Sequence, residues 1–207
     1  MFHLERAETD TVVALYDHEF RNLTAPLIQA LYIDAQKAAS MLFRLQLHGV
    51  DVGDRWEELA DKAEARIGDT QSAFTLPHWM MALAATGRAE AASRMLAALR
   101  DAAQAGSSHA ALVGAIALPL CEAVLAFGQD QPARAVALMR PVLGDVYRLG
   151  GSHAQQDVLE QLYLHAALRA GLDDDARLLL ERVAGRHKLP PHRRIGYRSA
   201  AQQLGFA

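Results

Sequence analysis

The sequence predicts an all-α protein built from antiparallel helical hairpins, and two observations carry this prediction. First, a small residue is followed five positions later by Ala or Val at four places, each time between two stretches of helical apolar spacing. These joints are Ala7 and Val12, Gly87 and Ala92, Gly128 and Ala133, and Gly171 and Ala176. Second, the hydrophobic share is 51% but the aromatic share only 6%, and this wealth of Ala and Leu favours closely packed helices over alternating strands.

The spacing of the joints indicates a repeat. A glycine at a helix end accepts the left-handed backbone that turns the chain back, and the small residue five positions later lets the returning helix pack closely. The glycine joints lie 41 and 43 residues apart, and Ala7 precedes Gly87 by about twice that distance. We therefore expect a degenerate hairpin in between, with helices over 32–47 and 55–66 and a break around Gly49. A period of about 40 residues is typical of an α-solenoid and exceeds the roughly 34 of the ordinary tetratricopeptide repeat.

The first joint comes almost at the start of the chain. Phe2–Glu5 has the pattern of the last turn of a helix, so the sequence predicts a single helical-repeat domain over residues 1–207 that begins in the middle of a repeat. Either the chain is the C-terminal part of a longer protein or its first returning helix has an uncovered apolar face. Exposed hairpin faces in such repeats need a cap or a partner, and we expect self-association through this end.

Two prolines fall inside predicted helices. Pro119 lies in one helix, and Pro141 lies in its partner, where apolar residues run at helical spacing from Ala135 to Val146. Because proline removes a hydrogen bond and clashes with the preceding turn in a helix interior, we expect a kink at each.

Charge and targeting signals exclude several partners. The formal net charge of −3 gives no positive field for nucleic acid or an anionic membrane, and the basic residues at 186–188 and 192–194 are expected to form a solvated tail. No signal peptide and no uninterrupted apolar stretch of membrane-spanning length is apparent. The single cysteine, Cys121, lies in an apolar run and is expected to be a small buried hydrophobe. These features favour a cytoplasmic protein.

Three histidines share one position in the predicted repeat. His78, His109 and His153 each lie in the first turn of the first helix of a hairpin, with Ser108 and Ser152 as expected N-caps. In a stack of hairpins these helix starts lie along one edge, where the helix dipole favours neutral imidazoles. A histidine-lined pocket is therefore one hypothesis, and a plain exposed or structural role is the other. The local spacing does not match a metal site.

Charged residues also occur within apolar segments. Arg44 and Asp34 lie on one predicted helix, and Glu122 lies on another. A buried charge needs a partner, so we expect Arg44 to pair with a carboxylate from a neighbouring helix. Arg44, Asp34 and Asp157 join the three histidines as candidate ligand-binding residues. The sequence has no catalytic triad, nucleophile elbow or dinucleotide fingerprint, and no catalytic residue, metal or cofactor is predicted.

Several segments carry a family resemblance. They are FHLE at 2–5, SMLFRL at 40–45, HGVDVGDRW at 48–56, LPLCE at 118–122 and, most specifically, RLGGSHAQQD at 148–157. Together they resemble the tetratricopeptide repeat protein 38 family over nearly the whole chain, but only the C-terminal half of a family member. The resemblance implies an α-solenoid of tetratricopeptide-like hairpins and supplies no reaction.

The chain departs from the family pattern at four places. That pattern has an acid at Lys37, Trp at Phe43, an Asn-Asp pair before His78 and Arg at Gln156. These departures weaken the expectation that the chain binds a family ligand. Of the family's polar positions, the chain keeps His78, His153 and Asp157, so a modified pocket stays open as a hypothesis.

Two functional hypotheses follow. The leading one is a non-catalytic helical-repeat protein that binds a protein or peptide, or acts as a scaffold, through its concave face. The alternative is a small-molecule binder or enzyme that uses the histidine-lined pocket with Asp157. Convergence of the three imidazoles in one closed pocket would favour the alternative.

Overall fold

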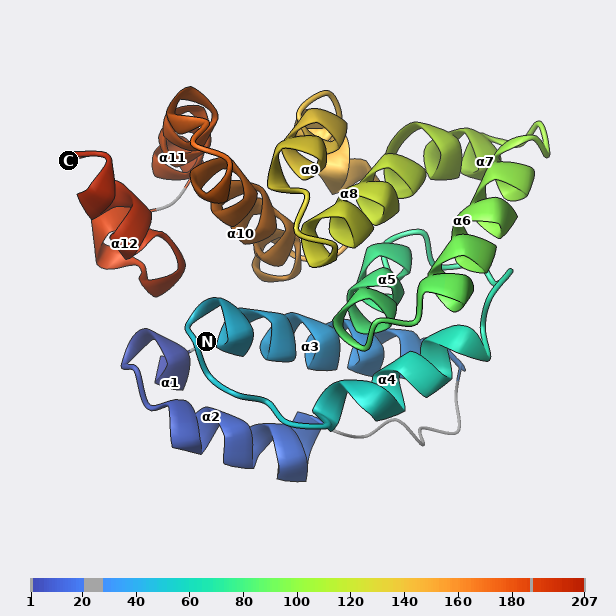
Figure 1. Ribbon diagram of the computed structural model, residues 1–207, viewed down its shortest axis with the longest axis horizontal. Helices are drawn as coiled ribbons and strands as arrows, with labels where there is room; N and C mark the ends of the chain where they lie inside the picture. Colours follow the sequence, from blue (N-terminus) through green and yellow to red (C-terminus); the bar gives the residue numbers. More distant parts are fainter. Residues whose placement is uncertain (1, 21–27, 187, 207) are drawn as a thin grey trace.

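The computed structural model describes residues 2–20, 28–186 and 188–206, and over these residues every regular element is a helix (Figure 1). Four helices, here called the A helices, are each followed along the chain by a second helix, here called the B helix. Each B helix packs against the A helix that precedes it. The A helices are α3 (Ile28–Leu47), α5 (Leu76–Ala85), α8 (Leu118–Gly128) and α10 (His153–Arg169). The B helices are α4 (Arg55–Glu64), α6 (Ala89–Ala103), α9 (Pro132–Met139) and α11 (Asp173–Arg186). The all-α prediction is confirmed for the part of the chain described.

One type of turn recurs throughout the molecule. A residue with left-handed backbone ends the first helix, and the next residue donates its N–H to the carbonyl five positions back, as in Arg88 to Leu83 at 2.9 Å. The left-handed residues of these turns are Ala7, Gly49, Gly87, Asp130, Gly171 and Gly205. The predicted degenerate joint at Gly49 is therefore confirmed. The third joint needs a correction, because Asp130 and not Gly128 has the left-handed backbone.

Gly128 serves helix packing instead of the turn. It is the last residue of α8, and a Cβ placed on it would lie 2.9 Å from the Cβ of Ala84 on α5. Real Cβ contacts are not that short, so only glycine lets these two A helices approach so closely.

Two matched glycine substitutions test this role. Gly128→Ala is expected to lower the free energy of unfolding by about 1–3 kcal/mol, because the new methyl group overpacks the contact between α5 and α8. Gly185→Ala, in α11 with no atom within 4 Å of its would-be Cβ, is expected to raise it by about 0.5 kcal/mol through helix propensity. Urea denaturation measures both. A stabilising Gly128→Ala would show that the packing is loose there.

The two prolines have different effects: the kink expected at Pro141 does not occur, and next to Pro119 a π-helical turn interrupts the regular helix. At Pro141 the helix simply stops, since α9 ends at Met139 and a 3₁₀ helix, η3 (Leu143–Leu149), follows. Pro119 is the second residue of α8 and comes directly after a π-helical turn, η2 (Val113–Ala117), which itself follows α7 (Ser108–Leu112). The wider π turn accommodates the ring that would clash in a regular helix.

Together α7, η2 and α8 form one long apolar helix. The run from Ser108 to Gly128 is 21 residues long and is the one helix in the described residues whose length and composition would allow it to cross a membrane. This corrects the expectation that no such stretch exists. Half of its most apolar window is buried inside the protein, and core helices share this composition.

The two ends of the chain lie at the same end of the molecule (Figure 1). At the N-terminal end, α1 (Phe2–Glu5) contacts α2 (Thr9–Leu15), which continues directly into the π-helical η1 (Tyr16–Phe20). Asp17 of η1 accepts two hydrogen bonds from Arg55. At the C-terminal end, η4 (Pro191–Arg193) leads into α12 (Ile195–Gln203), which packs on α10.

The basic segment that was expected to be a solvated tail is partly built into the fold. Arg186 pairs with the buried carboxylate of Glu160, and the side chain of Arg194, only 13% exposed, reaches Asp157. His187 lies outside the described residues.

The first and the last A helix touch each other. α3 contacts α5, which is the next A helix, but it also contacts α10, which lies more than 100 residues later (Figure 1). The A helices therefore form one packed group in which the first and the last are in direct contact.

Candidate functional site

A buried ion pair joins α3 to α10. Arg44 is only 4% exposed, and its Nη2 lies 3.3 Å from Oδ2 of Asp157. The same guanidinium donates to the carbonyls of Ala154 at 2.9 Å and Ser40 at 3.2 Å. The prediction that Arg44 pairs with a carboxylate from a neighbouring helix is confirmed, and the neighbour is the A helix most distant in sequence.

Asp157 also binds the C-terminal helix α12 and the residue directly before it. Its Oδ1 accepts hydrogen bonds from the hydroxyl of Tyr197 at 2.6 Å and from Nη2 of Arg194 at 2.8 Å, while Oδ2 also accepts from Gln161 at 2.6 Å. Burial would raise the pKa of Asp157, but Arg44, Tyr197 and Arg194 outweigh it and hold that pKa below its ordinary value. A carboxylate has about four acceptor sites, and all of them are used, which makes this group a structural anchor. We call Arg44, Asp157, Gln161, Arg194 and Tyr197 the charge centre.

His78 lies in the interior. Its side chain is fully buried, and Nδ1 donates to the carbonyl of Phe74 at 2.9 Å, which leaves Nε2 as the unprotonated nitrogen. Burial, together with the nearby positive charge of Arg44, lowers the pKa of His78 to about 4. Nε2 is buried without a hydrogen-bond partner. The imidazole is thus a neutral core group.

The other two histidines of the predicted rim are exposed. His109 is in the first turn of α7, and its Nε2 bonds the carbonyl of Thr70 at 2.7 Å. Ser107, not the expected Ser108, caps this helix. His153 is the first residue of α10, where the predicted cap is confirmed as a capping box. One buried and two exposed imidazoles do not share an environment, and no group of His, Cys, Asp and Glu in the described residues is suited to hold a metal.

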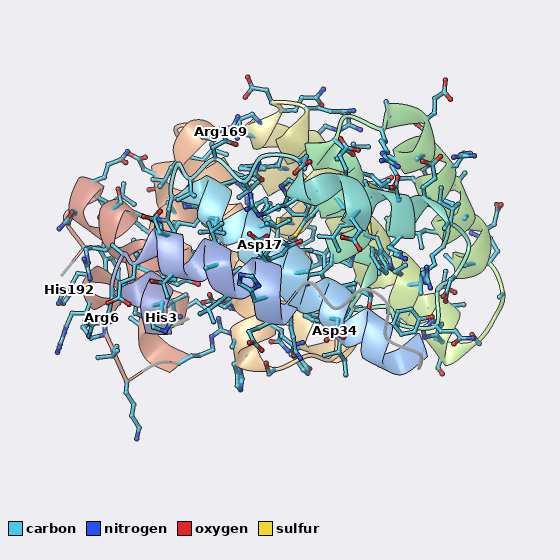
Figure 2. The ribbon with its side chains drawn as sticks, turned by 90° about the horizontal axis from the view of Figure 1, so that it is seen from below. His3, Arg6, Asp17, Asp34, Arg169 and His192 are labelled. Carbon is cyan, nitrogen blue, oxygen red and sulfur yellow. The ribbon has the colours of Figure 1, made fainter. Side chains whose placement is uncertain are left out.

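Asp34 does not join the charge centre. Its Oδ1 pairs instead with Nζ of Lys37, one turn later on α3, at 3.6 Å. Figure 2 shows Asp34 toward the lower side of the view, and Arg169 at the end of α10 toward the upper side. Cys121 is fully buried, and burial raises the pKa of its thiol far above the ordinary value, so it is not a reactive nucleophile.

A hollow of about 480 Å³ lies at the N-terminal ends of the A helices. We call it the N-terminal hollow. Its lining comes from the start of α3, the segment before α5, α7 and the end of η3, and consists of Tyr32, Ile33, Gln36, Gln71, Ser72, Ala73, His109, Leu112 and Leu149. Of the three predicted histidines only His109 is in this lining. The sequence thus located the edge but not most of the residues that line it.

Buried polar groups hold the wall of the N-terminal hollow in place. Gln36 donates to the hydroxyl of Thr75 at 2.7 Å and accepts from Gln155 at 3.0 Å, and Thr75 also bonds Ser72 at 2.6 Å. These contacts fix the amide of Gln36 before any ligand arrives. In the sequence, these contacts are signalled only by Gln36, a polar residue at a core-facing position of α3.

Tyr32 is fixed as well. Its hydroxyl donates to Asp69, and burial together with this carboxylate raises the pKa of the phenol to about 12. Tyr32 therefore stays neutral and presents a rigid aromatic wall to the N-terminal hollow.

The chain matches no protein-family model and no solved structure.

Proposed function

We propose that this chain is a non-catalytic, tetratricopeptide-like helical-repeat protein that binds an extended protein segment in the N-terminal hollow. The single observation that carries the proposal is this hollow, which lies at the N-terminal ends of the A helices. We further propose that the protein works in the cytoplasm and self-associates through its N-terminal hairpin.

The lining suits a peptide. An extended segment offers backbone N–H and C=O groups together with spaced apolar side chains. The exposed Gln71 supplies an amide group for the backbone, whereas Ile33, Leu112 and Leu149 supply apolar surface. Ile33 is 41% exposed, one of four large hydrophobic residues left this open in the described part of the chain, and exposed apolar surface beside polar groups is typical of protein interaction sites.

Selection from a displayed library of random 12-residue peptides tests this proposal. Peptides selected on the protein are expected to bind Ile33→Glu at least tenfold more weakly by fluorescence anisotropy, because a carboxylate would replace the apolar contact. The matched control is Leu178→Glu, an even more exposed apolar residue (60%) on α11 outside the hollow, and this variant should bind like the unchanged protein. Equal loss in both variants, or none in Ile33→Glu, would contradict the proposal.

One observation favours the alternative of a small-molecule binder. His109 lines the N-terminal hollow, and an exposed imidazole can donate to or accept from a polar ligand. In a thermal-shift screen of small metabolites, a stabilising compound whose effect is lost in His109→Gln would support this alternative. The peptide selection would then be expected to fail.

A further inference from the structure

A second pocket lies at the opposite, C-terminal ends of the A helices. Its volume is about 250 Å³, and all four A helices contribute to it. The aromatic and aliphatic wall is made by Phe43 of α3, Met81 of α5, and Val124 and Phe127 of α8. We call it the C-terminal pocket.

Small residues create its space. Ala84 and Ala85 of α5 and Gly128 of α8 form one side, and the close approach of Gly128 to Ala84 brings the two helices together there. Phe43 and Phe127 face each other obliquely, with ring centroids 5.9 Å apart and planes tilted by 53°. The two rings are therefore in contact and form one continuous aromatic wall of the pocket.

One charged group borders the pocket. Among the described residues that line the C-terminal pocket, Arg169 at the end of α10 is the only charged one. Its guanidinium lies over the ring of Phe127, 4.7 Å from the centroid. A guanidinium stacked in this way keeps the N–H groups on its edge available for a carboxylate. The amide of Gln46 is a further polar group in the lining.

The present partner of Arg169 is weakly held. Nη2 bonds Oδ1 of Asp130 at 2.6 Å, but the Asp130 side chain is 83% exposed. An exposed ion pair contributes little to stability, so another carboxylate competes with it readily. A ligand carboxylate in the pocket would add the apolar contacts that Asp130 does not make.

From this geometry we propose that the C-terminal pocket binds a carboxylate carried by an aromatic or branched apolar group. Arg169 takes the carboxylate, and the apolar group packs against the aromatic wall of Phe43 and Phe127. The pocket volume is below that of drug-sized sites, which sets the ligand at about ten heavy atoms. The same chemistry occurs in a free aryl-alkanoic acid and at the C-terminus of a protein chain that ends in an apolar residue. This site is separate from the N-terminal hollow and does not depend on the function proposed for it.

Protein-observed NMR titration distinguishes the two sources. The probes are 3-phenylpropionate, its uncharged amide, and a Gly-Gly-Phe peptide with either a free or an amidated C-terminus. The free acid is expected to bind with a dissociation constant on the order of 0.1–1 mM, and the amide at least fivefold more weakly. Tighter binding of the free-terminus peptide than of 3-phenylpropionate identifies a chain terminus as the ligand. The reverse order identifies a free acid.

Three variants and a control complete the experiment. Arg169→Gln should weaken binding of the acid at least fivefold without affecting the amide. Asp130→Asn should tighten binding of the acid about threefold, because it removes the competing carboxylate while Asn tolerates the left-handed backbone. Ala85→Leu, at an exposed position, should fill the pocket and abolish binding. Arg134→Gln, an exposed arginine outside the pocket, should leave binding unchanged. Equal binding of acid and amide, equal effects of Arg169→Gln and Arg134→Gln, or no binding at all would each overturn the proposal.

Discussion

Replacing Asp157 with asparagine is expected to lower the free energy of unfolding by about 3–5 kcal/mol. The substitution keeps the shape of the side chain but removes the negative charge that faces Arg44 and Arg194. Both the Arg44 and the Asp157 side chains are less than 5% exposed, so solvent cannot replace the lost partner. The hydroxyl of Tyr197 also loses its charged acceptor.

Chemical denaturation and amide hydrogen exchange measure this effect. Because Asp157 is the point where α3, α10 and α12 meet, exchange in residues 195–203 should accelerate more than exchange in α6. The control is Asp61→Asn, which breaks the ion pair between Asp61 and Arg88. Because the Asp61 side chain is 68% exposed, this substitution should lower the free energy of unfolding by less than about 1 kcal/mol. In a double-mutant cycle, Arg44→Met with Asp157→Leu should cost less than Asp157→Leu alone, because no unpaired Arg44 charge remains. A loss for Asp157→Asn no larger than that for Asp61→Asn would show that the charge centre is dispensable.

Mild acid is expected to destabilise the protein through His78. Its pKa is about 4 in the folded chain and near 6.5 when unfolded, so between these values the unfolded state binds a proton that the folded state does not. Stability is therefore fully present above pH 6.5 and falls as the pH is lowered toward 4. Between pH 6.5 and 5 this one group should cost roughly 1.5 kcal/mol.

The His78→Asn variant isolates this contribution. An asparagine amide can take over the hydrogen bond to the Phe74 carbonyl without gaining a proton, so the slope of unfolding free energy against pH should fall in urea denaturation series. Burial also lowers the pKa of His165 to about 4, and His165→Asn should reduce the slope of unfolding free energy against pH by a similar amount. The pH range above 5 avoids most carboxylate titration. An unchanged slope in His78→Asn would mean that His78 is not buried in solution.

Much of the local structure was predictable from the sequence. The turns follow from single residues that accept left-handed backbone, and the helices follow from apolar spacing, both of which depend on neighbours within a few positions. Gly128 was misassigned as a turn because a glycine required for close packing and one required for backbone conformation look alike in sequence. Asp130, two residues later, is one of the few side chains that tolerate the left-handed region, and this is why the turn forms there.

The candidate site was only partly predictable. Burial of a charge on an apolar helix requires a partner, so the pairing of Arg44 with a carboxylate followed from the sequence. The three equivalent histidines suggested a shared rim, but His78 faces the core while His109 and His153 face solvent. Equivalent positions in a repeat do not guarantee equivalent burial, since other parts of the chain cover His78, among them the ring of Phe74, and leave His109 and His153 exposed.

The sequence by itself determined that the chain folds into helices, where most of them turn, and that Arg44 needs a carboxylate, because these properties are local or follow from the cost of an unpaired buried charge. Only the tertiary structure decided that the carboxylate is Asp157, that α3 meets α10, and that open space remains at both ends of the A helices. Those outcomes depend on the crossing angles of successive helices, which accumulate over more than 100 residues and leave no local pattern in the sequence.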